Sequence, residues 1–426
     1  MEFNIEKLGA TGRNIEEDTI ILQRAIDDCS KFGGKVIIPR GKRYTINGIS
    51  LKSNVELHLE KNSCLRGSGD ENLYIKRPGP FERIKNNTPI HGLIFGKDLE
   101  NIKITGSGSI DGNYKAFIYP NQDESVKHLK FYKYPRPMTV YLENCNNTEI
   151  KDIYFFNAPF WTVHLVGCNK TYIEHVTINN EQRMPNTDGF DIDRCKNTKI
   201  FNCDIKTGDD AICPKCTEET YKYGDCKDLE VKNCKLTSAS SAIKFGSSSF
   251  GKFINCSFKN IIIKDSNRGL ALQLRDTDDI ENILFKDISI STNKFSQEWW
   301  GNAEPIYITA CKREKTTNLG HIRNISFKNI KCVSENGIFI YTDTLGHIEN
   351  ISFDNIEIEL KKKTTYKHGY DLRPCEESER INTNFSPIYA ENTINIVLRN
   401  LKIYDREDFL DTKKYIFKNC KNVFEI

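Results

Sequence analysis

A short sequence unit that recurs along the chain limits the fold more than any other feature. The ten residues from His321 read His-Ile-x-Asn-Ile-Ser-Phe-x-Asn-Ile, and the same pattern starts again at His347. Looser copies, in which apolar-x-apolar segments alternate with Asn, Asp or Gly, start at Asn101, Asn147, Cys195, Cys226 and Lys252. Repeats at intervals of roughly 20–30 residues indicate a solenoid, in which each unit packs on the next one.

The local pattern within each unit indicates strands rather than helices. Short apolar segments alternate with polar residues, and no helical segment separates them. Asn tolerates the left-handed backbone region and hydrogen-bonds to nearby backbone groups, so we expect ladders of Asn at the corners. These features predict an all-β fold, a single-stranded parallel β-helix. An antiparallel sandwich is the alternative, but the Asn-Gly and Asp-Gly hairpin turns that it needs are scarce.

The N-terminal segment is predicted to cap this solenoid. Residues 16–30 place apolar residues near the helical period, with Asp18 as the expected N-cap and Gly33-Gly34 as the stop signal. We expect an N-terminal cap over about residues 1–35, within one domain that covers residues 1–426. The segments predicted to be inserted loops along a groove are about 68–95, 112–138, 214–226, 292–320 and 361–386.

Composition and charge exclude several classes of protein. The chain has 61 Lys and Arg against 58 Asp and Glu, a net charge of +3, which argues against a nucleic-acid partner. No run approaches about 20 consecutive apolar residues, so we expect no membrane partner. Residues 1–6 contain neither a basic nor an apolar segment. A cytoplasmic location is therefore expected, or secretion if a leader once preceded this sequence.

The cysteines are predicted to be free thiols in the solenoid core. There are fifteen of them, scattered along a chain that is long enough to bury a core without disulfides. A zinc site at Cys213 and Cys216, with Cys203 and Cys226, is the alternative reading. No second Cys-x-x-Cys or His pair completes four ligands, so we predict no metal and no cofactor.

Two acidic motifs carry the clearest chemical signal. Asp188 lies in Asn-Thr-Asp-Gly before a predicted strand, and Asp209 and Asp210 follow it by 21 and 22 residues, close to one coil. Either motif alone is an ordinary turn sequence. At one-coil spacing, a β-helix would stack the three carboxylates, and mutual repulsion would raise the pKa of at least one of them. A protonated carboxyl beside ionised ones is the equipment for hydrolysing a glycosidic bond.

The chain resembles glycoside hydrolase family 28, the polygalacturonases and their relatives. The matching segments are NTDGFDIDRCKN from Asn186, GDDAI from Gly208, NAPFWTVHLVGC from Asn157 and GGKVIIPRGKRYTINGISLKSNVELHLEKNSCLRGS from Gly33. The resemblance covers roughly residues 5–290 and implies a right-handed parallel β-helix. It also implies an inverting hydrolysis in which Asp209 is the general acid while Asp188 and Asp210 activate water.

Two motifs of the family are missing, which marks this chain as a divergent member. The His of the family's Gly-His-Gly reads as Ser240, and its Arg-Ile-Lys reads as Ala271-Leu272-Gln273. Loss of both cations suggests a neutral sugar such as rhamnose or a pentose in the cleaved subsite. Lys244 and Arg275 could supply replacement charge for a galacturonate. If Ile243 and Phe245 are core, Lys244 faces the groove.

Further substrate-binding candidates come from the neighbouring coils and loops. His164 lies one coil before Asp188, and a satisfied structural His is an equally good reading. Trp299 and Trp300 form an adjacent pair in a polar loop, a pattern typical of a stacking surface for sugars. The remaining candidates are Arg183, Asn186, Ser240, Gln273 and Glu304, together with a charged loop at residues 371–375.

These observations predict an exo-acting, inverting glycoside hydrolase that removes a terminal sugar from pectin-derived or other plant oligosaccharides or glycosides. The expected partner is therefore an oligosaccharide or glycoside, and the sequence is compatible with a homo-oligomer. Two alternatives remain: a β-eliminating polysaccharide lyase on the same fold, and a non-catalytic carbohydrate-binding β-helix. An unsaturated, ultraviolet-absorbing product would identify the lyase.

Overall fold

The computed structural model describes residues 1–77, 89–376, 380–381, 386–405 and 414–426. The chain divides into two compact units, Met1–Gly208 and Asp209–Ile426, and each is described by itself. The single domain over residues 1–426 therefore stays a prediction. No helix in the described part of the chain is long and apolar enough to cross a membrane.

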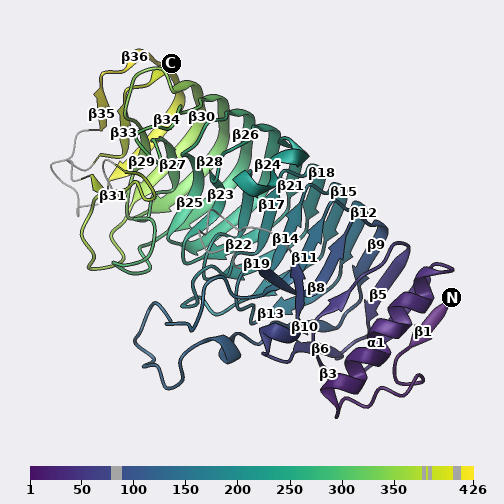
Figure 1. Cartoon of the computed structure of the whole chain (residues 1–426). Helices are drawn as coiled ribbons and strands as arrows, with labels where there is room; N and C mark the ends of the chain where they lie inside the picture. Colours follow the sequence, from purple (N-terminus) through teal and green to yellow (C-terminus); the bar gives the residue numbers. More distant parts are fainter. Residues whose placement is uncertain (78–88, 377–379, 382–385, 406–413) are drawn as a thin grey trace. The chain divides into compact units, whose positions relative to one another are not determined.

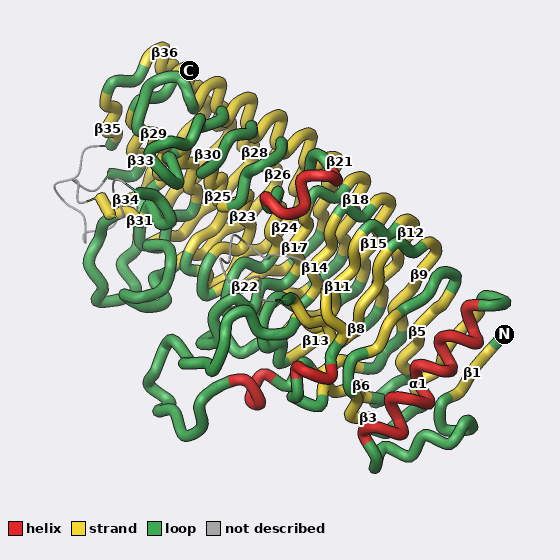
Figure 2. Tube along the Cα trace, viewed as in Figure 1, coloured by secondary structure: helices red, strands yellow, loops and turns green. Residues whose placement is uncertain are grey.

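Unit 1 is built from two parallel sheets wound from successive coils (Figures 1 and 2). The first sheet contains β1 (Glu2–Asn4), β2 (Gly34–Ile38), β3 (Arg43–Ile46), β5 (Val55–Leu59), β6 (Cys64–Gly67), β9 (Glu100–Thr105), β10 (Ser109–Asp111), β12 (Asn146–Lys151), β13 (Tyr154–Phe156), β15 (Asn169–Glu174), β16 (Thr177–Asn179), β18 (Lys196–Phe201) and β19 (Asp204–Thr207). The second contains β4 (Ile49–Ser50), β8 (Ile90–Lys97), β11 (Met138–Glu143), β14 (Val163–Val166) and β17 (Phe190–Asp193), with β7 (Ile75–Arg77) antiparallel to β8.

Unit 2 repeats this arrangement. Its first sheet contains β21 (Cys226–Lys232), β22 (Lys235–Ser238), β24 (Phe253–Ser266), β26 (Ile280–Thr292), β28 (Ile322–Ser334), β30 (Ile348–Leu360), β34 (Ile394–Asp405) and β36 (Lys421–Glu425). Its second contains β20 (Ile212–Lys215), β23 (Ser241–Ser247), β25 (Arg268–Leu274), β27 (Ile306–Ala310), β29 (Ile338–Thr342), β33 (Ile388–Glu391) and β35 (Tyr415–Lys418). The short strands β31 (Tyr370–Asp371) and β32 (Arg380–Ile381) pair antiparallel.

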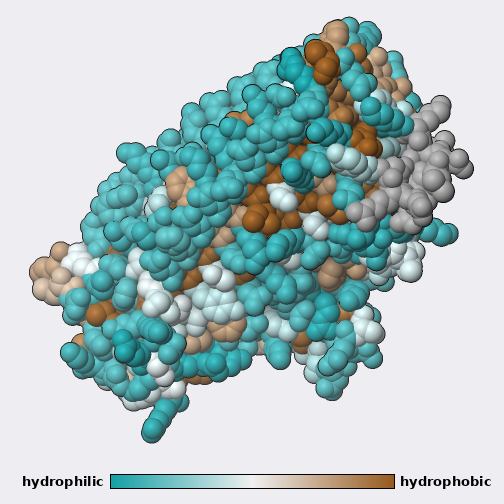
Figure 3. Space-filling model, turned by 180° about the vertical axis from the view of Figure 1, so that it is seen from behind, coloured by the Kyte–Doolittle hydropathy of each residue, from teal (hydrophilic) through white to brown (hydrophobic). Residues whose placement is uncertain are grey.

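The core consists of like residues stacked from coil to coil. In unit 2, the rings of Phe258, Phe285, Phe327 and Phe353 stack in succession, with centroids 5.1, 5.1 and 4.9 Å apart. In unit 1, the thiols of Cys145, Cys168 and Cys195 form a similar ladder. All fifteen cysteines are free, as predicted. Each coil buries only a few side chains, so the core needs no long apolar run in the sequence. On the face shown in Figure 3, polar residues cover most of the surface, with apolar patches between them.

Asparagine occupies the corners between strands, as predicted. Asn255, Asn282, Asn324, Asn350 and Asn395 all have φ between 57° and 59°. Each side-chain amide donates to the carbonyl oxygen of the preceding member, over 2.9 to 3.4 Å. The short Asn side chain tolerates the left-handed region, which costs most other residues about 1–2 kcal/mol.

Helix α1 (Ile15–Ser30) buries Leu22, Ala25, Ile26 and Cys29 at the N-terminal end of unit 1 (Figure 2). Its N-cap is Asn14, whose side chain accepts from the Glu17 amide at 3.2 Å, so the prediction of Asp18 was wrong. Asp18 is buried one turn later, where it accepts from the amides of Thr11 and Gly12 at 2.7 and 2.8 Å. The Asp18 carboxylate thus satisfies two amides of the preceding loop, while Asn14 caps the helix.

The predicted inserted loops contain more regular structure than expected. Three 3-10 turns lie in them, at Glu71–Leu73, Tyr114–Phe117 and Glu218–Tyr223. Strand β27 divides the segment 292–320 into two loops, and β31 and β32 lie within 361–386. The part of the first insertion at 78–88, and most of residues 377–385, lie outside the described residues.

Candidate active site

In unit 1, Asp188 lies at the end of a braced loop, two residues before β17. The main-chain oxygen of Asp188 accepts from the amide and hydroxyl of Thr162, at 2.9 and 2.7 Å. The hydroxyl of the preceding residue, Thr187, donates to the carbonyl of Met184 at 2.9 Å and accepts from the amide of Gly208 at 3.0 Å. Asp188 is buried, and its backbone is fixed by these contacts.

His164 lies on β14, opposite Asp191 of β17 in the sheet register. Its Nε2 is 3.5 Å from Oδ2 of Asp193, and its Nδ1 is 3.2 Å from the sulfur of Met138. The rings of Trp161 and Tyr141 make T-shaped contacts with the imidazole, at centroid distances of 4.8 and 5.3 Å. His164 is buried, and its role in substrate binding stays a prediction.

Arg183 and Asn186 flank the Asp188 loop and are held by neighbouring side chains. Arg183 donates to both oxygens of Glu181, at 3.0 and 3.1 Å. Asn186 has φ of 57°, and its Oδ1 accepts from Nη2 of Arg136 at 3.1 Å. Arg136 is itself buried, and its guanidinium lies over the ring of Phe131 at 3.8 Å. Nothing in its local sequence pattern singled out Arg136 as the anchor of this loop.

In unit 2, Asp210 is buried among hydrogen-bond donors. Its Oδ2 accepts from Nζ of Lys244 at 2.6 Å. Its Oδ1 accepts from the hydroxyl of Ser240 at 3.1 Å and from the amide of Ser241 at 3.2 Å. Burial raises the pKa of Asp210, but the charges of Lys244 and Lys215 outweigh burial and lower the pKa below its ordinary value. Asp210 is therefore a carboxylate at neutral pH.

For Asp209, the effects that raise the pKa outweigh those that lower it. It is partly buried, and its main-chain oxygen accepts from the hydroxyl of Ser238 at 2.6 Å. Burial and the negative charge of Asp210 together raise the pKa of Asp209 to about 6, although Lys244 and Lys215 act against them. Two adjacent carboxyl groups with pKa values pushed apart are the arrangement expected of an acid and a base partner.

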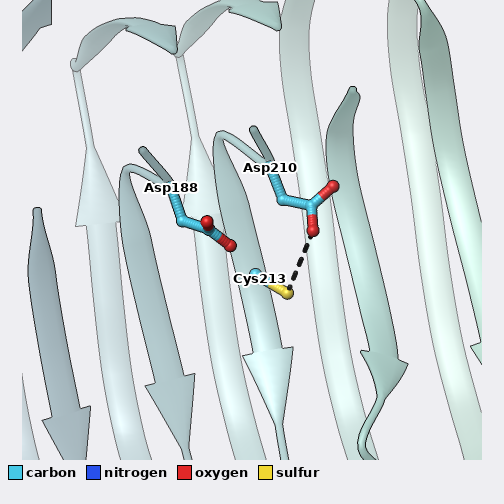
Figure 4. Close-up of side chains that lie close together, drawn as sticks. All are labelled: Asp188, Asp210 and Cys213. Carbon is cyan, nitrogen blue, oxygen red and sulfur yellow. Dashed lines mark hydrogen bonds between the residues drawn. The ribbon is translucent and has the colours of Figure 1, made fainter. Parts of the chain in front are cut away.

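Strands β20 and β23 place these groups on one face of the sheet. Ile212 pairs with Ile243 in the register, so the two core residues lie side by side. Because side chains alternate along a strand, Cys213 and Lys244 then point away from the core together. The Cys213 thiol donates to the Gly246 carbonyl at 3.3 Å and approaches Oδ2 of Asp210 at 3.8 Å, the contact dashed in Figure 4. Ile243 and Phe245 are core residues, and Lys244 is also buried, with its Nζ at Asp210; that it faces a groove stays a prediction.

The two adjacent tryptophans have different environments. Trp299 is buried and contacts Phe295 edge-on, at a centroid distance of 5.2 Å, so it belongs to the core of its loop. Trp300 is 41% exposed. Nζ of Lys244 and the guanidinium carbon of Arg373 lie 5.8 and 5.7 Å from its ring centroid, within range of cation–π attraction. Trp300 is thus the exposed aromatic surface next to the Lys244–Asp210 pair.

The charged segment Asp371–Pro374 is bound by side chains from β25, from the residue after it and from β27. Its carbonyl groups accept from four side chains: Arg268 and Tyr307 at Asp371, Arg275 at Leu372, Gln273 at Arg373, and Arg275 again at Pro374. Leu372 is fully buried in a cluster with Ala271, Tyr307 and Tyr389. We call residues Asp371–Pro374 the docked segment. Ala271, at the position where the family pattern has Arg, thus packs in the same buried cluster as Leu372.

Several predicted binding residues are therefore occupied with internal contacts. Arg275 is fully buried, and besides the docked segment it donates to the carbonyl and hydroxyl of Thr309, at 3.3 and 3.0 Å. Glu304 is fully buried and pairs with Arg268 at 3.2 Å. Their substrate-binding roles stay predictions, but the structure assigns both residues a part in holding loops on β25. Gln273 is also buried.

Lys215 and Arg268 are functional-site neighbours that the motif search missed. Lys215 lies two residues after Cys213 on β20, so strand alternation places it on the same face, and it is buried near Asp210. This alternation was a usable signal. Arg268 could not be found this way, because its partner Glu304 is 36 residues away in a loop. Three of the four cysteines of the alternative zinc site donate to carbonyl groups, Cys213 to Gly246, Cys216 to Lys252 and Cys203 to Phe201, and the fourth, Cys226, is a buried free thiol.

Comparison with known proteins gives a family and a fold. The family model described as glycosyl hydrolases family 28 matches residues 34–371, well beyond the residue 290 at which the sequence resemblance was expected to fade. A probable polygalacturonase of Vitis vinifera is 28% identical over 309 residues, which cover 69% of this chain and 62% of that protein. An exopolygalacturonase of Cochliobolus carbonum is 25% identical over 202 residues, covering 46% and 42%. The chain thus spans less than two thirds of the length of these two relatives.

Solved structures show the same fold. The family 28 exopolygalacturonase of Yersinia enterocolitica superposes with a TM-score of 0.70 at 16% identity, covering 99% of this chain and 78% of that one. The exopolygalacturonase of Thermotoga maritima superposes with a TM-score of 0.64 at 21% identity, covering 98% and 92%. The predicted right-handed parallel β-helix is confirmed.

Proposed function

The chain belongs to glycosyl hydrolase family 28, and we propose that it is an inverting glycoside hydrolase with Asp209 as general acid. The observation that carries this proposal is the difference in pKa between two adjacent carboxyl groups: Asp209 has a pKa raised to about 6, while the pKa of Asp210 is lowered. A group with a pKa near 6 holds its proton in mildly acidic solution and can give it to a leaving oxygen.

The proposed reaction is a single displacement at the anomeric carbon. Asp209 donates its proton to the glycosidic oxygen as the bond to the anomeric carbon breaks. Water attacks that carbon from the opposite side and loses a proton to a carboxylate, which gives the inverted sugar. Asp188 is proposed for this second role together with Asp210. Both precede a strand of the second sheet by two residues, β17 and β20, and both are buried.

The test compares Asp209→Asn with the parent enzyme on two kinds of substrate. A general acid contributes about 10²- to 10⁴-fold, so we expect at least a 100-fold loss of kcat on oligosaccharides. On a dinitrophenyl glycoside the loss should be small, because that leaving group needs no proton. Proton NMR of the first-formed sugar should show the inverted anomer. Equal losses on both substrates, or a retained anomer, would refute the assignment.

The docked segment supports exo action. Its backbone lies along Arg268 and Gln273 of β25 and Arg275 just after it, and β25 is the strand on which the family pattern places its cations. We propose that a sugar chain cannot continue across this strand, so that the enzyme releases one terminal sugar. The distribution of products from a pectic oligomer decides this point. A monosaccharide should appear alone from the first time point, and early release of mixed oligomers would contradict exo action.

The charge distribution of unit 2 supports a neutral terminal sugar. Lys244 pairs with Asp210 at 2.6 Å, Arg373 with Asp371 at 2.6 Å, and Arg268 with Glu304 at 3.2 Å. Each of these cations already has an acidic partner, so a substrate carboxylate would have to compete for it. A screen of rhamnosides, arabinosides, apiosides and galacturonides tests the proposal, and activity on galacturonides alone would overturn it.

A further inference from the structure

We infer that Lys244 is a positioning residue that acts through Asp210, keeping Asp210 ionised so that the catalytic proton resides on Asp209. This inference rests on the proposed function and deepens it. It also changes the expected role of Lys244, which the sequence suggested as a contact for the substrate.

The geometry places the Lys244 ammonium on Asp210. Nζ of Lys244 is 2.6 Å from Oδ2 of Asp210, and both side chains are at least nine-tenths buried. A charge-assisted hydrogen bond at this distance, away from water, is among the stronger polar interactions in a protein. Breaking it to bind a substrate group would leave a buried carboxylate without its hydrogen-bonded cation, which is strongly unfavourable in a site away from water.

The other groups around Asp210 reinforce the ionised state. On Oδ1, Ser240 and the amide of Ser241 both donate, and a carboxylate accepts two such bonds better than a carboxylic acid. The titratable groups that face Asp210 within unit 2 are Asp209 from its own loop, Cys213 and Lys215 from β20, and Lys244 from β23. Two cations therefore oppose one neighbouring carboxyl group and a thiol.

The consequence for Asp209 follows from Coulomb repulsion. If Asp210 keeps its negative charge over the working pH range, the adjacent Asp209 is the group that retains a proton. If Asp210 could also be protonated, the pair would share one proton and the acid would be on the wrong residue for part of the time. Lys244 thus decides which of the two carboxyl groups is the acid, without touching the substrate.

Lys244→Met is the main test, with Lys244→Arg as the conservative variant. The profile of kcat/KM against pH has an acidic limb that reports protonation of Asp210. We expect this limb to move upward by at least one pH unit in Lys244→Met, a tenfold change in proton affinity, and to return toward its original position in Lys244→Arg. A purely structural role would lower activity at every pH without moving the limb. A substrate-binding role would raise KM instead.

A second measurement does not depend on activity. Carbon NMR of aspartate-labelled protein follows the carboxyl titrations directly, with Asp210→Asn to assign the resonance. We expect the Asp210 resonance to titrate at least one pH unit higher in Lys244→Met and to shift less in Ser240→Ala, which removes only a neutral donor. Lys252→Met, on an exposed lysine paired with Glu281, is the control and should leave Asp210 unchanged.

These outcomes separate the two proposals. If Asp210 titrates higher in Lys244→Met, the inference holds even where no glycoside is hydrolysed, and only the proposed function fails. If the Asp210 titration is the same in the parent protein and in Lys244→Met, the inference is wrong whatever the activity.

Discussion

At the scale of single residues, the clearest indication of function is that two adjacent aspartates have pKa values shifted in opposite directions. Asp209 and Asp210 are adjacent in the chain, yet burial and repulsion raise the pKa of the first, and two lysines lower that of the second. Strand geometry produces this contrast. Asp210 lies next to β23, whose Lys244, together with Ser240 just before the strand, supplies donors that stabilise its charge.

The raised pKa of Asp209 predicts a pH dependence of stability. The folded state binds this proton with a pKa of about 6, whereas the group has an ordinary value of 3.8. Between these values the folded state binds more protons than the unfolded state, so stability falls as the pH rises from about 4 to 6 and stays lower above. Asp209→Asn removes the effect. We therefore compare the free energy of unfolding of the variant with that of the parent at each pH. This difference should be about 2 kcal/mol more in favour of the variant at pH 8 than at pH 4.

Urea unfolding at the two pH values measures this difference. Asp204→Asn, on an exposed aspartate of β19, is the matched control and should show nearly the same difference from the parent at both pH values. A variant whose stability relative to the parent does not depend on pH would show that Asp209 is ionised in the fold as it is in the unfolded chain.

The acidic motifs could be predicted from the sequence, but the hydrogen-bond partners of the other polar residues could not. The Asp pair is local, and its spacing from Asp188 follows the repeat. Arg275 and Gln273 looked like substrate contacts because their partners, the carbonyls of residues 372–374, are about a hundred residues away. No pattern within a strand reveals that a distant loop docks on it.

At the scale of elements, corners and strands were more predictable than loops. The Asn corners, the buried cysteines and the approximate bounds of α1 follow from local periodicity and backbone preference. Strand β27 was missed within the expected insertion 292–320, because it is short and lies between two loops. The N-cap of α1 was misplaced because Asp18 satisfies tertiary donors, which helix-capping rules do not consider.

The Asn ladder of unit 2 predicts a specific pair of substitutions. Asn324 has φ of 59°, donates to Asn282 at 3.2 Å and accepts from Asn350 at 3.2 Å. Asn324→Ala loses both exposed bonds and places a Cβ-bearing residue without a local hydrogen bond in the left-handed region, so we expect a loss of about 2 kcal/mol. Asn324→Gly loses only the bonds and should cost less than half as much.

Thermal or urea unfolding of the two variants separates the contributions. The difference in free energy of unfolding between the Ala and Gly variants gives the cost of the left-handed backbone. The loss that remains in the Gly variant gives the contribution of the Asn hydrogen bonds. Equal losses in both variants would mean that the left-handed corner contributes nothing to the preference for Asn.

At the scale of the whole molecule, the core is distributed along the chain, and the cysteines belong to it. Thirteen of the fifteen thiols are buried, and only Cys375 and Cys420 are partly exposed. Burial raises the pKa of Cys256 to about 12, and it likewise raises the pKa of Cys332 and Cys311. A thiol with a raised pKa is a poor nucleophile at neutral pH.

This distribution predicts the reactivity of the native protein toward a thiol reagent. At pH 8 we expect at most two fast-reacting thiols, and all fifteen after unfolding in guanidinium. Cys375→Ser and Cys420→Ser should each remove one fast thiol. Because no disulfide is present, the Tm should also be the same with and without a reductant. More than two fast thiols, or a Tm that falls by several degrees on reduction, would contradict the free and buried state of these cysteines.

Strands β28 and β30 pair along their whole length, and identical residues meet at five of the eleven paired positions, among them Ile325 with Ile351, Ser326 with Ser352 and Phe327 with Phe353. On the core side, each of these coils therefore offers its neighbour much the same Ile and Phe side chains. Recombination between the two similar gene segments would delete or duplicate a full turn of chain, and at the new junction most of the core Ile and Phe side chains would meet their like. A protein built this way can lengthen or shorten during evolution in whole turns, while each intermediate keeps an intact core.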